Sequence, residues 1–74
     1  MDNQNLKAFI TVAEQSSFSE AANLLYITQS AISKRIAQLE QQIGKRLFDR
    51  IARQVSLTEA GNELLPRARR ILQK

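Results

Sequence analysis

Residues 28–34 (TQSAISK) hold the side chains whose types and spacing are best suited to chemistry. Apolar residues at positions 32, 36, 39 and 43 recur at helical spacing and predict one buried stripe on a helix. The opposite face and its flanks then carry groups that hydrogen-bond base edges or phosphates, namely Gln29, Ser30, Ser33 and Lys34. Because this face lacks the Glu–Lys pairing of a merely solvated helix surface, the pattern favours a nucleic-acid-binding face.

The residues that most enzymes use for acid–base or nucleophilic work are missing. The 74-residue chain has no Cys and no His, which excludes disulfides, structural zinc and Cys–His or Ser–His nucleophiles. It has no Gly-rich phosphate loop, and Glu59 and Glu63, one turn apart, suit a helix start and solvent. We therefore expect no catalytic residue, metal or cofactor, and an enzyme is the least favoured function class.

The charge is unevenly distributed along the chain. There are 11 basic and 7 acidic residues, giving a net charge of +4 and a pI near 10.1. Residues 1–33 hold one base against three acids, whereas residues 34–74 hold ten bases against four acids. A pI above about 9 with one basic half is typical of a protein that binds a polyanion. Apolar runs too short for a membrane span and the lack of a signal peptide predict a cytoplasmic protein without a membrane partner.

Three helices are predicted ahead of residue 44. A cap near residue 2 opens the first helix, which should stop near residue 15, where two serines interrupt the apolar pattern. Ser17 and Glu20 form a capping box that opens a short second helix. Thr28 is a good cap for the third helix, and Gly44 is a natural end for it.

The second and third helices and the tight turn between them fit a helix-turn-helix plan. Ala22, Leu25, Ile27 and Ile32 are the apolar positions that would fix the helix crossing. Such turns commonly contain Gly, but Tyr26 stands here, so this residue must adopt a permissive backbone conformation or the turn must differ. A small helical bundle with a polar face is the alternative interpretation.

A short hairpin and a fourth helix are predicted after Gly44. The pieces at 47–50 and 55–57 could pair, although the residues between them offer no typical turn chemistry. A helix from Thr58 has an acid at its start and bases toward its end. Pro66 should bend this helix or divide it into two pieces. The helix also carries an apolar seam that would face water in a lone subunit and suits a second helix, comprising Leu64, Leu65, Ala68, Ile71 and Leu72.

These residues occur in an order that resembles the N-terminal DNA-binding domain of LysR-type transcriptional regulators. The resemblance covers about nine-tenths of the chain, and the ordered string is far more specific than any single piece. Its matching elements are Leu6-x-x-Phe9, Ala13-Glu14, Ser17-Phe18, Ala21-Ala22, Leu24-Leu25, residues 28–33 (TQSAIS), Ile36, Leu39-Glu40, Gly44, Leu47-Phe48-x-Arg50, Leu57-Thr58-x-Ala60-Gly61 and residues 68–72 (ARRIL).

The resemblance implies a mainly α fold. A winged helix-turn-helix of three helices plus a short two-stranded wing would occupy residues 1–57, and residues 58–74 would start a linker helix. In this family the third helix enters the major groove, and the wing touches the flanking minor groove or backbone. Carried over to the matching positions, the DNA-binding residues are Gln29, Ser30, Ser33 and Lys34 in the groove, Thr28 at a phosphate, and Arg50 and Arg53 on the wing.

The resemblance also implies partners. These are double-stranded DNA with an inverted repeat, a second copy paired through the linker helix, and a small-molecule effector of a C-terminal domain that this chain lacks. The predicted function is therefore sequence-specific DNA binding by a homodimeric transcriptional regulator. The alternative is a helical protein-interaction or dimerisation module whose basic residues only keep the surface soluble.

Three residues depart from the pattern of the family. Many members carry Pro at the position of Ser30 or Ala31, and Arg is more usual than Lys34. Base contacts should therefore differ, because Lys cannot make the rigid two-pronged contact that Arg makes with guanine. Ile51 places an apolar residue near the wing tip, for which the pattern offers no role.

Overall fold

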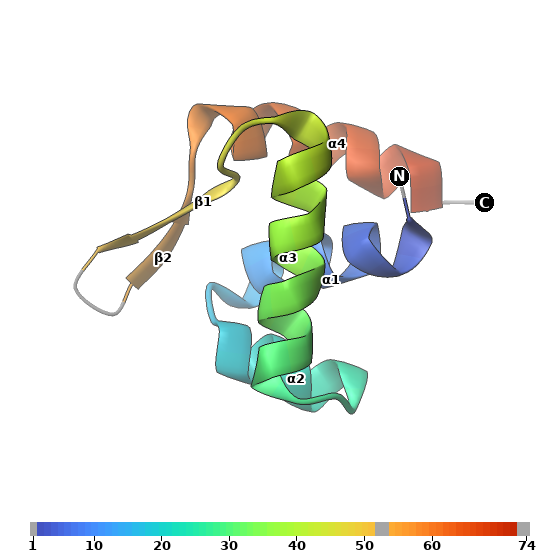
Figure 1. The fold of residues 1–74 in the computed structure, drawn as a ribbon, viewed down its shortest axis with the longest axis vertical. Helices are drawn as coiled ribbons and strands as arrows, with labels where there is room; N and C mark the ends of the chain where they lie inside the picture. Colours follow the sequence, from blue (N-terminus) through green and yellow to red (C-terminus); the bar gives the residue numbers. More distant parts are fainter. Residues whose placement is uncertain (1, 52–53, 73–74) are drawn as a thin grey trace.

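Four helices and one hairpin make up the computed structural model, which describes residues 2–51 and 54–72 (Figure 1). In chain order they are α1 (Asn3–Gln15), α2 (Phe18–Leu25), α3 (Gln29–Ile43), β1 (Phe48–Ile51), β2 (Gln54–Leu57) and α4 (Glu59–Leu72). The predicted mainly α, winged helix-turn-helix fold is thereby confirmed. The boundary between a winged helix-turn-helix over residues 1–57 and the start of a linker helix over residues 58–74 stays a prediction.

The helix starts are fixed by the side chains that the sequence indicates. The Ser17 hydroxyl accepts a hydrogen bond from the Glu20 amide at 3.1 Å, and the Thr28 hydroxyl accepts one from the Ala31 amide at 3.1 Å. Asp2 caps α1 in the same way. Each cap satisfies an amide that has no partner within its helix, and each stabilises the fold by about 1 kcal/mol. The predicted caps of α2 and α3 are confirmed.

The turn between α2 and α3 is built around Tyr26. Tyr26 has φ 57° and ψ 38°, in the left-handed region, so the predicted permissive conformation is confirmed. The Ile27 amide donates to the Ala22 carbonyl at 3.1 Å, and the Tyr26 amide donates to the Asn23 carbonyl at 3.3 Å. This is the Schellman ending of a helix, which Gly usually provides. For a residue with a side chain the left-handed conformation costs about 1–2 kcal/mol.

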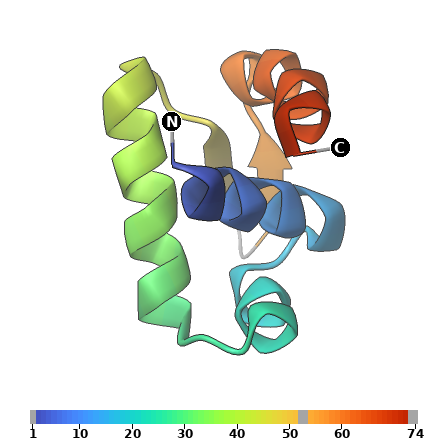
Figure 2. The same ribbon diagram turned by 90° about the vertical axis from the view of Figure 1, so that its right-hand side faces the viewer.

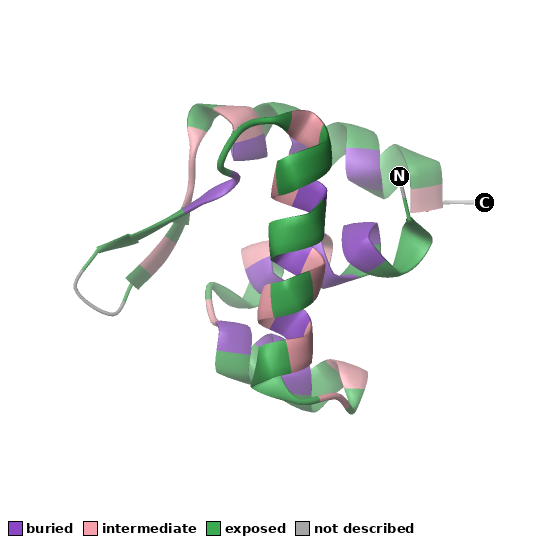
Figure 3. Ribbon diagram, in the orientation of Figure 1, coloured by how far each residue is buried: buried purple, intermediate pink, exposed green. Residues whose placement is uncertain are grey.

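The core forms around α1, which packs against each of the other three helices (Figure 2). Its apolar stripe, with Leu6, Phe9 and Val12, is fully buried. The apolar stripe of α3 faces the same core, where Ile32, Ile36 and Leu39 are all buried, and Gly44 ends α3 with φ 78°. As Figure 3 shows, buried residues alternate along α3 with exposed ones, so one face of this helix is left to solvent.

The wing is an antiparallel pair of strands, as predicted. Phe48 pairs with Leu57 at its base and Ile51 with Gln54 at its outer end. The predicted lack of turn chemistry at the tip concerns residues 52 and 53, which lie outside the described residues. Phe48 anchors the wing, because its ring is tilted against Phe9 with centroids 5.4 Å apart.

Two polar contacts fix where the wing leaves the helices. The Leu47 amide donates to a Glu40 carboxylate oxygen at 2.8 Å, which ties the start of β1 to α3. The Thr58 hydroxyl donates to the Arg46 carbonyl at 2.6 Å and joins the far end of the hairpin to its beginning. The wing is therefore held at both ends of the hairpin.

Helix α4 runs from Glu59 to Leu72 through Pro66, so of the two predicted outcomes, a bend or a division into two pieces, the division is excluded. Pro66 is exposed, and a helix tolerates one missing hydrogen bond when packing on its other face holds it. Gly61 permits the close approach of α4 to the wing. A Cβ at Gly61 would overlap the Leu47 carbonyl oxygen and lie 2.8 Å from a methyl of Leu57.

Candidate nucleic-acid interface

The polar face of α3 lies open to solvent. Gln29, Ser30 and Lys34 are exposed, as is the capping residue Thr28. These positions belong to the first two turns of α3 and to its cap, at the end of the helix that joins α2 (Figure 1). Because the apolar face of α3 is buried against α1 and α2, these side chains are free to contact another molecule.

Ser33 is placed differently from its neighbours. It is half-buried and lines a hollow of about 210 Å³ between α3 and β1, which Phe18, Phe48 and Arg50 also line. The Ser33 hydroxyl borders the space between α3 and the wing. Ser33 therefore belongs to the seam between the two elements, not to the most exposed line of α3.

Arg50 connects the wing to the helix-turn-helix. Its guanidinium carbon lies 3.9 Å from the centroid of the Phe18 ring, at the start of α2. Such a cation–aromatic contact is worth about 0.5–1 kcal/mol at an exposed site, and it holds the flexible side chain in one place. Arg50 is nevertheless exposed, so its charge remains available to an anion.

A second hollow, of about 320 Å³, joins Arg50 to the start of α3. It is lined by residues from α2 and the turn before it, from α3 and from both strands, including Ser17, Gln29, Arg50 and Gln54. Arg50 thus borders both the hollow that contains Gln29 and the hollow that contains Ser33. The structure brings together Gln29, Ser33 and Arg50, which are far apart in the sequence, whereas Arg53 lies outside the described residues.

Sequence reasoning missed the role of Phe18. Strand alternation could have given the side of β1 on which Arg50 lies, because Arg50 follows Phe48 by two residues, but not the ring that it contacts. Because Phe48 points into the core, Arg50 lies on the side of β1 that faces the helices. The ring of Phe18 also meets Phe48 edge-on, with centroids 5.8 Å apart, so one aromatic cluster positions the wing and its Arg together.

The five residues predicted for dimerisation do not form one exposed seam. Leu64 is 9% exposed and Ala68 is 0% exposed, and both belong to the core of their own chain. The expectation that they face water in a lone subunit is wrong, because both side chains are buried in the core that α4 helps to form. Leu65 and Leu72 are half-buried, and Ile71 is 48% exposed. The available part of the seam is thus at the end of α4.

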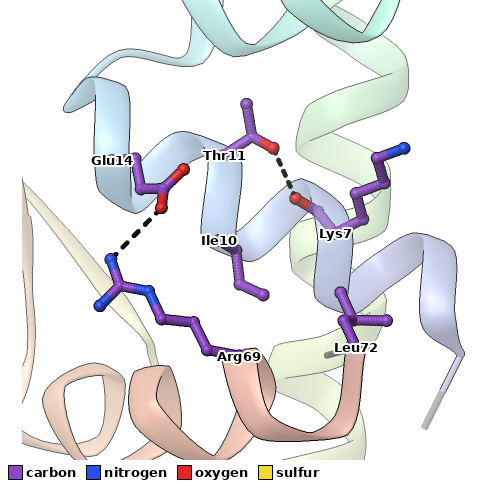
Figure 4. Close-up of a pocket in the computed structure, with 6 residues that line it drawn as sticks. All are labelled: Lys7, Ile10, Thr11, Glu14, Arg69 and Leu72. Carbon is purple, nitrogen blue, oxygen red and sulfur yellow. Dashed lines mark hydrogen bonds and ion pairs between the residues drawn. The ribbon is translucent and has the colours of Figure 1, made fainter. Parts of the chain in front are cut away.

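A hollow of about 430 Å³ lies beside that end of α4 (Figure 4). An ion pair crosses it, with the Arg69 guanidinium 3.3 Å from a Glu14 carboxylate oxygen. Both side chains are about half exposed, so the pair contributes little, about 0–1 kcal/mol. Ile10 and Leu72 supply apolar lining to the same hollow.

Among the described residues, no helix is long and apolar enough to cross a membrane.

Comparison with solved structures finds closely similar folds. The crystal structure of the CbnR_DBD–DNA complex has a TM-score of 0.93 and 40% identity, and the match covers 97% of this chain and 83% of that one. The crystal structure of the BenM_DBD/catB site 1 DNA complex has a TM-score of 0.92 and 35% identity, covering 97% of this chain and 81% of that one.

Curated relatives match over nearly the whole chain. An "Uncharacterized HTH-type transcriptional regulator in ibpB-leuC intergenic region" from Azotobacter vinelandii is 65% identical over 72 residues, covering 97% of this chain and 50% of the relative. The regulator YbhD of Escherichia coli K12 is 49% identical, covering 95% of this chain and 22% of the relative. The chain therefore spans half or less of the length of these relatives.

The match to a family model covers the whole helix-turn-helix and the wing. Residues 3–62 match the model described as "Bacterial regulatory helix-turn-helix protein, lysR family". This range includes α1, the whole of α2 and α3, the hairpin and the start of α4. The chain thus belongs to the lysR family of bacterial regulatory helix-turn-helix proteins.

Proposed function

We propose that this chain binds double-stranded DNA sequence-specifically, as the DNA-binding part of a bacterial transcriptional regulator. The observation that carries the proposal is the exposed polar face at the start of α3, opposite the buried side chains of Ile32, Ile36 and Leu39. An α-helix of this kind fits the major groove. The similar solved structures include LysR-type DNA-binding domains in complex with DNA, which supports the same proposal.

The residues divide into those that read bases and those that hold the DNA backbone. Gln29, Ser30 and Lys34 reach base edges from the first turns of α3, and Ser33 contacts the groove wall beside the wing. Thr28 lies at a phosphate. Arg50 and Arg53 contact the flanking minor groove or backbone, where positive charge supplies affinity and little sequence information.

The regulator acts as a dimer on an inverted repeat, because two-fold symmetry in the protein matches two-fold symmetry in the operator. Ile71, exposed at the end of α4, supports this arrangement, and the half-buried Leu65 and Leu72 of the same helix complete the proposed contact. A small-molecule effector acts through a C-terminal domain of a longer protein. The chain is a binding protein with no catalytic step, and its place of action is the bacterial cytoplasm, with the chromosome.

A protein-interaction module is the second candidate, because Ile71 is a large apolar residue left exposed on α4. Charge reversal separates the two functions. Lys34→Glu and Arg53→Glu should abolish binding to duplex DNA if the Lys34 and Arg53 side chains contact phosphates or the edges of DNA bases. Unchanged binding would favour the interaction module.

Selection from a random duplex library tests the proposal. The wild-type chain should enrich two half-sites in inverted orientation, about 10 base pairs apart or a multiple of that spacing. In gel-shift titrations, log K should fall against log salt with a slope of about −0.9 for each phosphate neutralised. Failure to retain any duplex at about 50 mM salt would refute DNA binding.

A further inference from the structure

Tyr26 is the most exposed of the large apolar and aromatic side chains in the described residues. It is 95% exposed, and its backbone lies in the left-handed region with φ 57°. The two hydrogen bonds that end α2 come from the backbone amides of Tyr26 and Ile27, not from the Tyr26 ring. Glycine would form the same turn without strain.

A strained residue whose side chain makes no stabilising contact points to a function outside the folded chain. Burial of the Tyr26 ring does not offset this strain, since a ring that is 95% exposed removes almost no apolar surface from water. Ile27 is half-buried and packs against the core, so the turn that presents Tyr26 is fixed in place. Tyr26 therefore stands on a rigid support.

The position of the turn identifies what Tyr26 can reach. Tyr26 precedes Gln29, the first residue of α3, by three residues, so their Cα atoms lie within about 11 Å of each other. The turn joins α2 to the end of α3 that carries the exposed polar face (Figures 1 and 2). When α3 enters a groove, the turn is left at the edge of that groove, where the sugar–phosphate backbone runs.

We propose that the Tyr26 hydroxyl donates a hydrogen bond to a backbone phosphate at the edge of the groove that holds α3. Tyrosine suits this contact, because its phenol is a donor and its ring loses little rotational freedom on binding. The inference rests on the proposed function. It adds to that function a contact that is sequence-independent, made by a neutral donor from the helix-turn-helix turn.

Two variants test the contact, because they change stability and binding differently. Tyr26→Gly removes the strain and the hydroxyl, so the midpoint of thermal unfolding should rise by about 5 °C while Kd for duplex DNA weakens about tenfold. Tyr26→Phe removes the hydroxyl alone. It should unfold like the wild type and still lose most of the same affinity.

The probe is a fluorescent random-sequence duplex pool of about 30 base pairs, titrated at several salt concentrations by anisotropy. The slope of log K against log salt should stay at the wild-type value in both variants, since no charge is removed. Leu24→Ala is the matched control, because Leu24 is 53% exposed near the end of the same helix and should bind as the wild type.

The outcomes are distinguishable from failure of the proposed function. If the wild type fails to bind the duplex pool, DNA binding itself is refuted. Wild-type affinity in both Tyr26 variants would overturn the phosphate contact alone. Full affinity in Tyr26→Phe with a loss in Tyr26→Gly would also overturn it, as would an equal loss in Leu24→Ala, because both results indicate an apolar contact.

Discussion

Helices α3 and α4 carry the same kind of apolar pattern, yet the two helices use it differently. In α3 the apolar stripe is buried inside its own chain, and the face opposite is left for another molecule. In α4 the stripe that suggested a partner is also buried inside its own chain at Leu64 and Ala68. Apolar spacing therefore identifies which face of a helix is buried, but not what covers it.

The difference arises from α1, which lies against both helices. A chain of this length buries only about 60% of its unfolded surface, so its core needs apolar residues from every helix. Leu64 and Ala68 are drawn into that core, whereas Ile71 lies beyond it at the end of α4 and stays exposed. The seam thus divides between folding and association.

Placing a charge in the buried part of α4 should have the largest effect. Ala68 is 0% exposed, so Ala68→Asp would bury an unpaired carboxylate or force α4 off α1. We expect a loss of more than about 4 kcal/mol in the free energy of unfolding, measured by thermal and urea unfolding. A variant that unfolds like the wild type and differs only in its oligomeric state would contradict the placement of Ala68 in the core.

Gly61→Ala should have the next largest effect, since the added Cβ would overlap the Leu47 backbone. We expect a loss of about 1–3 kcal/mol, because the rigid carbonyl cannot move aside as a flexible side chain could. Gly44→Ala is the matched control. A Cβ there would meet no neighbouring part of the fold within 4 Å, so the cost is the left-handed conformation alone, about 1–2 kcal/mol. A gain in stability in Gly61→Ala, or a loss smaller than that in Gly44→Ala, would argue against close contact between α4 and the wing.

Lys34→Ala probes the open face of α3 and should affect binding without affecting the fold. Lys34 is exposed, so the free energy of unfolding should change by less than about 0.5 kcal/mol. Binding should weaken by about 1–3 kcal/mol, with relaxed preference at one base pair of the selected site. Arg53→Ala should instead weaken binding to all duplexes alike and flatten the salt slope. Identical effects of the two variants on sequence preference would refute this division.

Ile71→Asp should have the smallest effect on the fold. Its side chain is 48% exposed, so the free energy of unfolding of the monomer should change by less than about 0.5 kcal/mol. If Ile71 lies in a dimer interface, sedimentation should show a shift toward monomer. If the variant sediments as the wild type, Ile71 does not lie in the interface. Ile71→Asp and Ala68→Asp would then differ only in their effect on the stability of the fold.

Local signals predicted most of the fold. The caps at Ser17 and Thr28, the end of α3 at Gly44 and the left-handed Tyr26 depend on residues within one or two turns of each other. Such short-range rules can be applied to a sequence directly. The hairpin was also predicted, but from alternation in only a few residues, and its tip lies outside the described residues.

Contacts between distant segments were the part that the sequence could not provide. The Arg50–Phe18 contact and the placement of Ser33 in a hollow depend on how the wing is set against the helices. The continuity of α4 through Pro66 likewise depends on packing against α1, which offsets the lost hydrogen bond. The side-chain types of the site residues made them predictable from the sequence. Which of these residues lie next to each other could be seen only in the structure.

Amide chemical shifts of the 74-residue chain, recorded during titration with a selected duplex, test the account most directly. The largest changes should fall at Gln29, Ser30 and Lys34 and in the wing at Arg50. The hollow between α1 and α4, around Ile10 and Arg69, should change little. Changes concentrated in that hollow, with α3 unaffected, would contradict the placement of the start of α3 in a DNA groove.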